Sequence, residues 1–282
     1  MILFPHCKIN LGLSIIEKRT DGYHSLETIF YPVRLTDIVE VIPAASTNNI
    51  SSTTDHKIIP VFSQSGIQVP GDSMNNLCIK AYQVLKQDYP LLPNIQIHLH
   101  KNIPMGAGLG GGSSDGTAVL KMLNTIFKLN ISFEKMLDYA AQLGSDCPYF
   151  LYDQPCHAVG RGEILATNEI CLDDYDIILI HPGVHISTAW AFAQLQPCKK
   201  DKSILDIIQQ PITTWKSELI NDFEAPVFKA HPPLANIKEQ LYSKGAVYAS
   251  MSGSGSSLFG LFQKSEKLPT LHFDKSILYN WI

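Results

Sequence analysis

The feature that most constrains this chain is a run of five glycines within the seven positions 106–112. It follows an alternating apolar segment, 95–100, which predicts a strand, and it precedes 117–127, whose pattern predicts a helix. A glycine loop in this position can bring backbone N–H groups close to an anion at the positive end of the helix dipole. Ser113 and Ser114 add hydroxyls where a phosphate or its metal ion would sit. The stretch therefore predicts a site for a nucleoside triphosphate.

Other glycine loops share part of this pattern, and the neighbouring residues discriminate between them. No Gly-Lys-Ser/Thr follows the glycines, which excludes a Walker A loop. Gly106, Gly108 and Gly111 satisfy the G-x-G-x-x-G pattern of dinucleotide-binding folds. The first strand of those folds is buried on both faces, whereas 95–100 has one polar face. A flexible loop without a ligand is the third alternative, and the conformational cost of so many glycines disfavours it.

Composition and charge narrow the class of protein. A chain of 282 residues with 45% hydrophobic and 17% charged residues predicts one large or two moderate globular domains. The net charge of -4 provides no basic field for nucleic acid. Six cysteines without a C-x-x-C pair indicate reduced, mostly buried thiols rather than a disulfide framework or a zinc site. With no apolar run near the roughly 20 residues that span a membrane and no signal-peptide pattern, we expect a cytoplasmic protein.

The N-terminal segment 6–16 alternates and predicts a strand. Strict alternation would place Lys8, Asn10, Gly12 and Ser14 on one face and apolar residues on the other. A polar turn at 18–25 follows, with an Asp-Gly turn signal that presents Tyr23 and His24. Taken alone, the lysine could equally be a solvated strand residue, and the two aromatic residues could be ordinary turn residues.

The remaining periodic segments predict a mixed α and β chain. The first half is expected to contain strands at 26–33, 37–43, 57–62 and 66–69, and helices at 76–88 and 132–143. The second half is expected to contain strands at 176–181, 246–250 and 258–262, and helices at 187–194, after 221–224 and around 238–242. Asn75 or Asn76 would cap the first helix and Gly144 would end the second. Asp146 lies just beyond, where an isolated aspartate is most often a helix cap.

A glycine-punctuated crossing at 156–165 predicts a domain boundary, which gives domains 1–155 and 156–282. A second glycine and serine turn at 251–257 lies in the C-terminal half. Each of the two glycine turns alone could be a linker or a hairpin. Together with a strand lysine they predict a phosphate-binding cleft between the halves.

Three segments resemble the motifs of the GHMP small-molecule kinases, in the same order: Lys8-Ile-Asn-Leu-Gly-Leu, Pro104-Met-Gly-Ala-Gly-Leu-Gly-Gly-Gly-Ser-Ser-Asp and Met251-Ser-Gly-Ser-Gly-Ser-Ser. The resemblance implies an α+β two-domain fold, with an N-terminal α/β domain like the second domain of ribosomal protein S5 and a ferredoxin-like C-terminal domain. Four further segments narrow it to kinases of a cytidine diphosphate sugar alcohol: Arg19-Thr-Asp-Gly-Tyr-His, Gly144-Ser-Asp-Cys-Pro, His181-Pro-Gly-Val and Asn221-Asp-Phe-Glu.

The same resemblance implies a reaction and its partners. ATP, with Mg²⁺, would phosphorylate the 2-hydroxyl of a methylerythritol moiety, giving ADP and the 2-phosphate in non-mevalonate isoprenoid precursor synthesis. Small molecules would be the only substrates, with no nucleic-acid or membrane partner, and the protein would be a monomer or a homodimer. Another GHMP kinase, of the homoserine or mevalonate type, is an alternative that leaves the Asp-Gly-Tyr-His turn without a role. A dinucleotide-binding module without kinase activity is another.

Roles follow from the matched positions. Asp146 would accept or orient the proton of the substrate hydroxyl, and Lys8 would favour the ionised aspartate and stabilise charge on the transferring phosphoryl. The matched ATP-binding residues are Pro104, Met105, Gly106, Ala107, Gly108, Leu109, Gly110, Gly111, Gly112, Ser113 and Ser114. The substrate residues are Asn10, Tyr23, His24 and Phe192, of which Tyr23 and Phe192 would stack on cytosine and His24 would read its polar edge. Gly253, Ser254, Gly255 and Ser256 would support the cleft.

Two departures from the family pattern are visible. Cys7 precedes Lys8, where the family motif opens with Ala-Lys. A carboxylate ligand for Mg²⁺, which other kinases of the superfamily provide, has no matched residue here, so the metal ligands are unknown. The segment after Leu268 is also without an assigned role.

Overall fold

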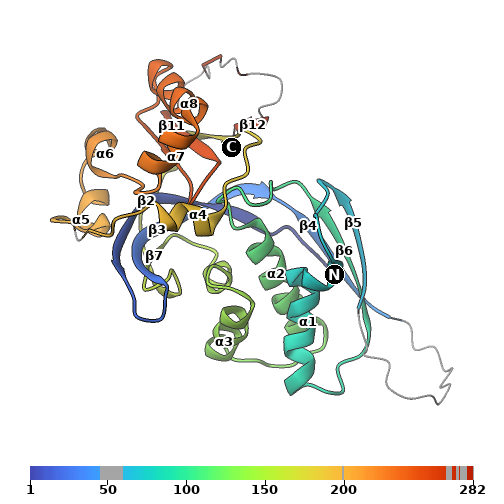
Figure 1. The fold of residues 1–282 in the computed structure, drawn as a ribbon. Helices are drawn as coiled ribbons and strands as arrows, with labels where there is room; N and C mark the ends of the chain where they lie inside the picture. Colours follow the sequence, from blue (N-terminus) through green and yellow to red (C-terminus); the bar gives the residue numbers. More distant parts are fainter. Residues whose placement is uncertain (45–59, 199, 265–268, 271–272, 274–277, 282) are drawn as a thin grey trace. The chain divides into compact units, whose positions relative to one another are not determined.

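The structure is a computed structural model that describes residues 1–44, 60–198, 200–264, 269–270, 273 and 278–281 (Figure 1). Its internal contacts divide the chain into two compact units, each built from separate segments. Unit 1 comprises Met1–His6, Leu35–Ile103 and Gly111–Leu151, and unit 2 comprises Cys7–Arg34, Pro104–Gly110 and Tyr152–Ile282. The two units interleave along the sequence, because each contains segments from the N-terminal half. The division into domains 1–155 and 156–282 stays a prediction.

Unit 1 is a four-stranded sheet with helices on one face (Figure 1). The strand order is β1 (Ile2–Leu3), β4 (Ile38–Pro43), β6 (Ile95–Lys101) and β5 (Val61–Gly66), with β5 and β6 parallel and the other pairs antiparallel. The helical elements are η1 (Ser73–Asn75), α1 (Leu77–Asp88), α2 (Gly111–Ile126), α3 (Phe133–Leu143) and η2 (Cys147–Leu151). Ile95, Ile97 and Leu99 of β6 are buried against them, while Gln96 on the opposite face is exposed. The predicted alternation of this strand is therefore confirmed.

Capping residues set the ends of α1 and α3 as predicted. The side chain of Asn76 accepts a hydrogen bond from Cys78 N, and that of Ser132 accepts one from Lys135 N. Such side chains satisfy backbone N–H groups that a helix start leaves without a partner. At the other end of α3, the N–H of Gly144 donates to Ala140 O.

Two predicted boundaries in unit 1 were wrong. Helix α2 begins at Gly111, six positions before the predicted start at 117, so Gly111, Gly112, Ser113 and Ser114 are helical rather than part of the loop. Glycine has a low helix propensity, so the sequence did not predict a helix start here. The missing side chain lets the backbone of Gly111 lie close to Ile103. A Cβ on Gly111 would lie 2.8 Å from Ile103 Cγ2. The predicted strand 66–69 is absent, because β5 ends at Gly66, while part of the predicted strand 57–62 lies outside the described residues.

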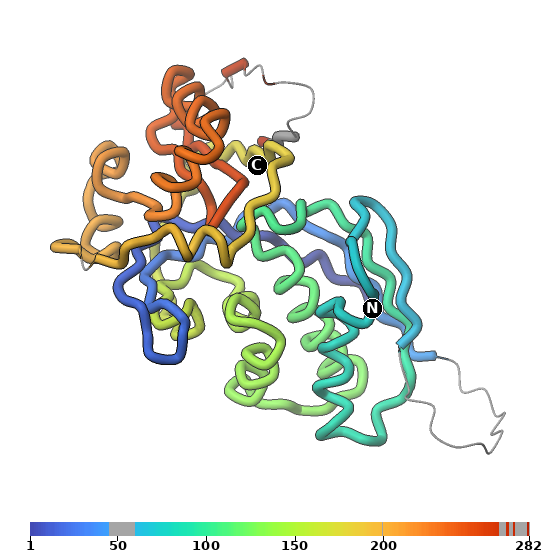
Figure 2. Tube along the Cα trace, in the orientation of Figure 1, coloured from blue at the N-terminus to red at the C-terminus, as the bar shows by residue number. Residues whose placement is uncertain are grey.

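Unit 2 contains two four-stranded sheets. The first has the order β2 (His6–Lys18), β3 (His24–Thr36), β7 (Cys156–Val159) and β8 (Ile164–Thr167), and Figure 2 shows β2 and β3 as the long blue hairpin. The second has the order β10 (Tyr248–Met251), β11 (Leu258–Gln263), β9 (Tyr175–His181) and β12 (Leu278–Trp281). The helices are α4 (Thr188–Ala193), α5 (Ile204–Ile208), α6 (Ile212–Glu218), α7 (Glu224–Ala230) and α8 (Pro232–Ser243). The short helices α5 and α6 were not predicted from the sequence.

Gly12 lies within β2 with φ +65°, in the left-handed region that glycine adopts readily. Leu13 and Ile15, which follow it, pack in the apolar cluster that contains Met251. The common face of Lys8, Asn10, Gly12 and Ser14 stays a prediction.

No helix in the described part of the chain is long and apolar enough to cross a membrane. All six cysteines are free thiols; four are buried, and Cys171 and Cys198 are exposed.

Candidate active site

The predicted catalytic lysine is buried on β2 of unit 2, with 3% of its surface exposed. Its ammonium donates to Asn10 Oδ1 at 2.7 Å and lies 4.9 Å from the centroid of the Phe30 ring. Asn10 Nδ2 in turn donates to Thr28 Oγ1 at 3.0 Å, and Thr28 donates to Gly12 O at 2.5 Å. The alternative of a solvated strand lysine was therefore wrong. This chain of hydrogen bonds fixes both ends of the Asn10 amide.

The loop that carries the first three glycines, residues 102–110 and here called the first glycine loop, is hydrogen-bonded to the same strand. Lys8 N donates to Leu109 O at 3.0 Å. Ala107 and Leu109 are buried, whereas Met105 and Gly106 are exposed. The loop therefore anchors its apolar side chains in the unit and leaves its first glycine accessible.

A second loop, residues 252–257 between β10 and β11, packs on the first and is here called the second glycine loop. Ser257 N donates to Ala107 O at 3.1 Å, and Ser252 Oγ donates to Gly108 O at 2.9 Å. A Cβ on Gly108 would lie 2.0 Å from Ser252 O, so only glycine permits this approach. Ser254 Oγ lies 3.2 Å from Thr188 Oγ1 of α4, and Ser256 Oγ donates to Val184 O. Two loops that are far apart in the sequence thus form one cluster.

The rest of the predicted phosphate-binding stretch lies in unit 1, at the start of α2. Ser113 is half-buried there and Ser114 is buried. Thr117 Oγ1 donates to Cys147 O at 3.0 Å, which attaches this helix start to the segment that carries Asp146. Burial raises the pKa of the Cys147 thiol to about 12, while hydrogen bonding with Ser113 partly opposes the shift. Asp146, half-buried beside that thiol, is therefore held at the N-terminal end of α2.

Predicted catalytic residues are distributed over both units, with Lys8 in unit 2 and Asp146 in unit 1. The loop residues 104–110 belong to unit 2, and the chain passes into unit 1 at Gly111. The convergence of Lys8 and Asp146 on one hydroxyl stays a prediction.

The predicted substrate aromatics lie in unit 2. Tyr23 is 56% exposed at the turn between β2 and β3, with the Arg161 guanidinium 4.9 Å above its ring. The rings of His24 and Phe192 stack, with centroids 4.9 Å apart and an interplanar angle of 22°. The pKa of His24 is lowered, first by burial and then by the charge of Lys18, which favours the neutral imidazole.

A buried ionic cluster in unit 1 was not anticipated from the sequence. Lys101, at the end of β6, donates to Asp37 and, at 2.7 Å, to Asp115 Oδ2 of α2. Asp37 Oδ1 also accepts hydrogen bonds from Asn102 N at 2.6 Å and Ile103 N at 2.8 Å. These contacts attach the beginning of the first glycine loop to the first turns of α2. The Oδ1 atom of Asp115 is buried without a hydrogen-bond partner among the described residues.

Sequence reasoning also missed three residues of unit 2 that contact the predicted site. Thr28 and Ser252 hydrogen-bond directly to Asn10, and Asn221 hydrogen-bonds to the second glycine loop. Thr28 is a polar residue within a strand that was predicted, and Asn221 opens the Asn-Asp-Phe-Glu segment quoted above. The sequence placed these residues in predicted elements or motifs, but it could not predict their hydrogen-bond partners.

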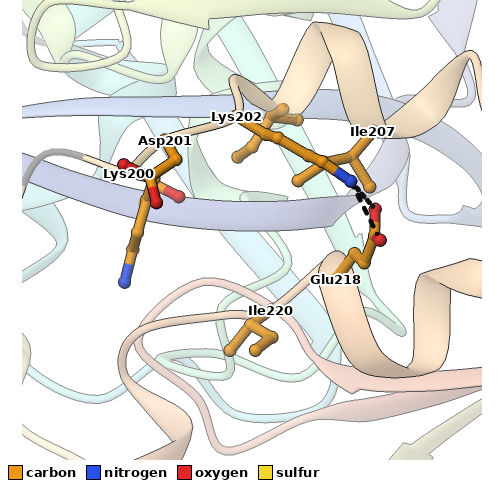
Figure 3. A pocket seen from close by; sticks show the side chains of 8 residues that line it. Lys200, Asp201, Lys202, Ile207, Glu218 and Ile220 are labelled. Carbon is orange, nitrogen blue, oxygen red and sulfur yellow. Dashed lines mark hydrogen bonds and ion pairs between the residues drawn. The ribbon is translucent and has the colours of Figure 1, made fainter.

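A cavity of about 310 Å³ also occurs in unit 2, and none of the predicted site residues line it. Its walls come from β2, the segment before α5, and helices α5 and α6 (Figure 3). Lys202 and Glu218 form an ion pair across its rim, with both nitrogen–oxygen distances at 3.0 Å. Ser14 of β2 is among the residues that line this cavity.

No cluster of three or more His, Cys, Asp or Glu side chains in the described residues could hold a metal ion.

Comparisons with known proteins identify the family. Residues 76–154 match the model of the GHMP kinases N terminal domain, and 210–271 match that of the GHMP kinases C terminal region. The chain is 46% identical to a 4-diphosphocytidyl-2-C-methyl-D-erythritol kinase of Bacteroides fragilis, over 99% of this chain and 98% of that protein. It is 49% identical to one of Bacteroides thetaiotaomicron, over 95% and 94%.

Solved structures give the same result. A crystal structure of 4-(cytidine 5'-diphospho)-2C-methyl-D-erythritol kinase superposes with a TM-score of 0.75 at 30% identity, covering 93% of this chain and 90% of that one. The Methanococcus jannaschii mevalonate kinase, at 14% identity and a TM-score of 0.65, covers 93% and 90% and shows the shared fold alone. The expected two-domain α+β fold is confirmed. The chain belongs to the GHMP kinases and, within them, to the family of 4-diphosphocytidyl-2-C-methyl-D-erythritol kinases.

Proposed function

We propose that this protein transfers the γ-phosphoryl group of ATP to the 2-hydroxyl of 4-diphosphocytidyl-2-C-methyl-D-erythritol, giving ADP and the 2-phosphate in the non-mevalonate route to isoprenoid precursors. The observation that carries the proposal is the cluster of Lys8, Asn10 and the two glycine loops in a chain 46–49% identical to kinases of that name. Phosphoryl transfer is catalysed mostly by positioning the reactants and by stabilising charge. A buried lysine hydrogen-bonded to a glycine loop suits both tasks.

The first glycine loop and the start of α2 are proposed to bind the triphosphate. Gly106 is exposed, so its backbone would be accessible to a phosphate group. The start of α2 adds backbone N–H groups that have no intrahelical partner. The hydroxyl of half-buried Ser113 is a better candidate than that of buried Ser114 for the Mg²⁺ that accompanies ATP. Mg²⁺ commonly binds through few protein ligands, substrate phosphates and water, which fits a site without a carboxylate cluster.

Lys8 and Asp146 are proposed to act on the reacting hydroxyl. Asp146 would accept or orient its proton, and the Lys8 ammonium would stabilise charge on the phosphoryl group in flight. The contacts of Lys8 with the Asn10 amide and the Phe30 ring support this role, because they hold the ammonium in a defined orientation.

The acceptor is proposed to bind along Asn10 and the aromatic residues. Cytosine would stack between Tyr23 and Phe192, and His24 would read its edge. Because the rings of His24 and Phe192 stack on each other in the structure, the His24 ring has to turn aside for cytosine to reach that face of Phe192. A neutral imidazole suits this task, since it can both donate to and accept from the uncharged base.

The proposal extends to context. Because both ATP and the acceptor are charged and water-soluble, we place the enzyme in the cytoplasm. We propose that it is a monomer or a homodimer in which one chain supplies the catalytic residues of each site.

Release of ADP in the presence of ATP, Mg²⁺ and the diphosphocytidyl substrate tests the proposal. We expect turnover with that acceptor, and none with homoserine or mevalonate at equal concentration. Asp146→Asn should lower kcat by about 10²–10⁴-fold while changing the KM for the acceptor little, because a general base acts during the transfer. Turnover with mevalonate alone would overturn the substrate assignment, and thermal stabilisation by NAD in place of ATP would overturn the kinase assignment.

A further inference from the structure

Asn221 is completely buried between α6 and α7 of unit 2, and all of its polar atoms are engaged. Its Nδ2 donates to two carbonyls, Met251 O at 2.7 Å and Gly253 O at 2.8 Å. Its Oδ1 accepts a hydrogen bond from Phe223 N at 3.0 Å. One amide thus holds two backbone positions at the start of the second glycine loop.

The segment that carries Asn221 is itself attached to β2. Leu13 N donates to Ile220 O at 3.0 Å, and Asp222 N donates to Leu13 O at 2.8 Å. The carboxylate of Asp222 also accepts a hydrogen bond from Ile15 N at 2.9 Å. Because Asn10 lies on the same strand, the Asn221 amide spans a short path between the Asn10 strand and the second glycine loop.

The second glycine loop contacts both the first glycine loop and Asn10. Ser252 Oγ donates to Gly108 O at 2.9 Å and lies 3.4 Å from Asn10 Oδ1. A displacement of the start of the second glycine loop would therefore change the contacts of Gly108 and of the partner of Lys8, because closely packed interiors transmit displacement.

We infer that Asn221 is a positioning residue of the kinase site. It fixes the start of the second glycine loop where Ser252 contacts both Gly108 and Asn10. It touches no substrate, and it acts through the loop. This inference rests on the proposed function only for its kinetic readout.

The chemistry of the amide makes the role specific. Two N–H donors diverge from one planar group, which matches two carbonyls presented by neighbouring backbone positions. An aspartate has the same size but would place an oxygen against those carbonyls, and a serine would retain a single donor. If the side chain only filled space, Asp would be the mildest replacement, whereas a positioning role makes Asp the most harmful.

The test compares Asn221→Ser, Asn221→Ala and Asn221→Asp. We expect kcat/KM for ATP to fall in that order, by about fivefold for Ser and on the order of 10²-fold for Asp, as misplacements of about 1 Å do. Asn124→Ala is the matched control, because it removes a side-chain acceptor of Ile131 N in unit 1. It should lower the melting temperature without lowering kcat/KM.

A second measurement uses ¹⁵N-glycine labelling. The amide signals of Gly253 and Gly108 should shift in Asn221→Ser, while that of Gly245, which has open space around it, should not. Wild-type kinetics in the folded Asn221→Ser and Asn221→Ala variants, or unshifted Gly253 and Gly108 signals, would overturn the inference. If the wild-type protein releases no ADP, the proposed function fails while the glycine signals still decide the role of Asn221.

Discussion

Two buried lysines, one in each unit, differ in the contacts that the structure gives them. Lys8 and Lys101 both lie on strands next to the first glycine loop, and they are 3% and 1% exposed. Lys101 contacts the carboxylates of Asp37 and Asp115, whereas the contacts of Lys8 include the Asn10 amide and the Phe30 ring. Lys101 belongs to a buried ionic cluster, and Lys8 is the lysine proposed to act on the phosphoryl group.

The contacts of Lys101 indicate a structural role. Burial alone would lower the pKa of Lys101, but the charges of Asp115 and Asp37 outweigh it, and the pKa is raised. Removing the cation from such a cluster is destabilising, because it leaves buried carboxylates without compensation. Lys8 is instead proposed to stabilise charge on a phosphoryl group. We therefore expect substitutions at the two lysines to separate stability from activity.

Replacing Lys101 should have the largest effect. Lys101→Met leaves two buried carboxylates facing each other without a cation, and we expect the free energy of unfolding to fall by about 3–5 kcal/mol. Urea denaturation followed by circular dichroism measures this change. The control is Lys135→Met, which removes an exposed ion pair with Asp88 and should cost less than about 1 kcal/mol. Equal losses in the two variants would contradict a structural role for Lys101.

Replacing Lys8 should instead remove activity. Lys8→Met keeps the apolar stem, so we expect a folded protein whose kcat falls on the order of 10²–10³-fold, the size typical of one lost charge-stabilising donor. Lys202→Met serves as the control, because Lys202 pairs with Glu218 at the cavity rim away from the glycine loops. If Lys8→Met unfolded as readily as Lys101→Met, the distinction between the two lysines would be lost.

The two lysines also show how far sequence reasoning extends. A role for Lys8 could be predicted because its own motif and the glycine motif resemble those of a family and occur in the same order. The role of Lys101 could not be assigned, since its partners lie 64 and 14 positions away and nothing local connects them. Strands such as β6, β9 and β11 were predicted because their hydrophobic patterns persist over several residues.

The errors arose where a tertiary contact overrides a local pattern. Gly111 and Gly112 read as loop, yet they begin α2, because Gly111 packs directly on Ile103. Gly12 was interpreted as an ordinary strand position, yet it has a positive φ, which favours glycine. In both cases the local structure depends on glycine having no side chain. Hydrophobic periodicity cannot reveal such a position, because glycine contributes nothing to the pattern.

A smaller effect is expected from the proton on Asp115. Burial, reinforced by Asp37 and opposed by Lys101, raises the pKa of Asp115 to about 7. Because the unfolded pKa is about 3.9, the folded state keeps a proton that the unfolded chain releases between these values. This group therefore stabilises the fold at low pH and loses that contribution as the pH rises from about 4 to about 7.

Asp115→Asn removes this titration. The free energy of unfolding of the variant, measured in urea from pH 5 to pH 8, should improve relative to the wild type as the pH rises. Asp138→Asn, at an exposed position of α3, should leave the wild-type pH dependence unchanged. A difference between Asp115→Asn and the wild type that is constant with pH would show that Asp115 does not titrate in this range.

The smallest effect on kcat is expected at Thr28, which hydrogen-bonds to Asn10, the partner of Lys8. Thr28 is buried, accepts the hydrogen bond of Asn10 Nδ2 and donates to Gly12 O. Thr28→Val preserves shape but leaves the Asn10 amide without one partner, which costs about 1–3 kcal/mol for a buried donor. Since Lys8 still holds Asn10 Oδ1, the amide is weakened rather than released, and we expect kcat to fall only several-fold, well below the loss in Lys8→Met.

Thr28→Ser distinguishes the hydroxyl from the methyl group. It retains the hydrogen bonds to Asn10 and Gly12, so kcat should return to near the wild-type value even though a small apolar group is missing. If Thr28→Ser lowered kcat as much as Thr28→Val, packing rather than hydrogen bonding would orient Asn10. The Asn10 amide that contacts Lys8 would then be positioned by packing around Thr28. Lys8 and Lys101 would in that case differ only in which residues they contact.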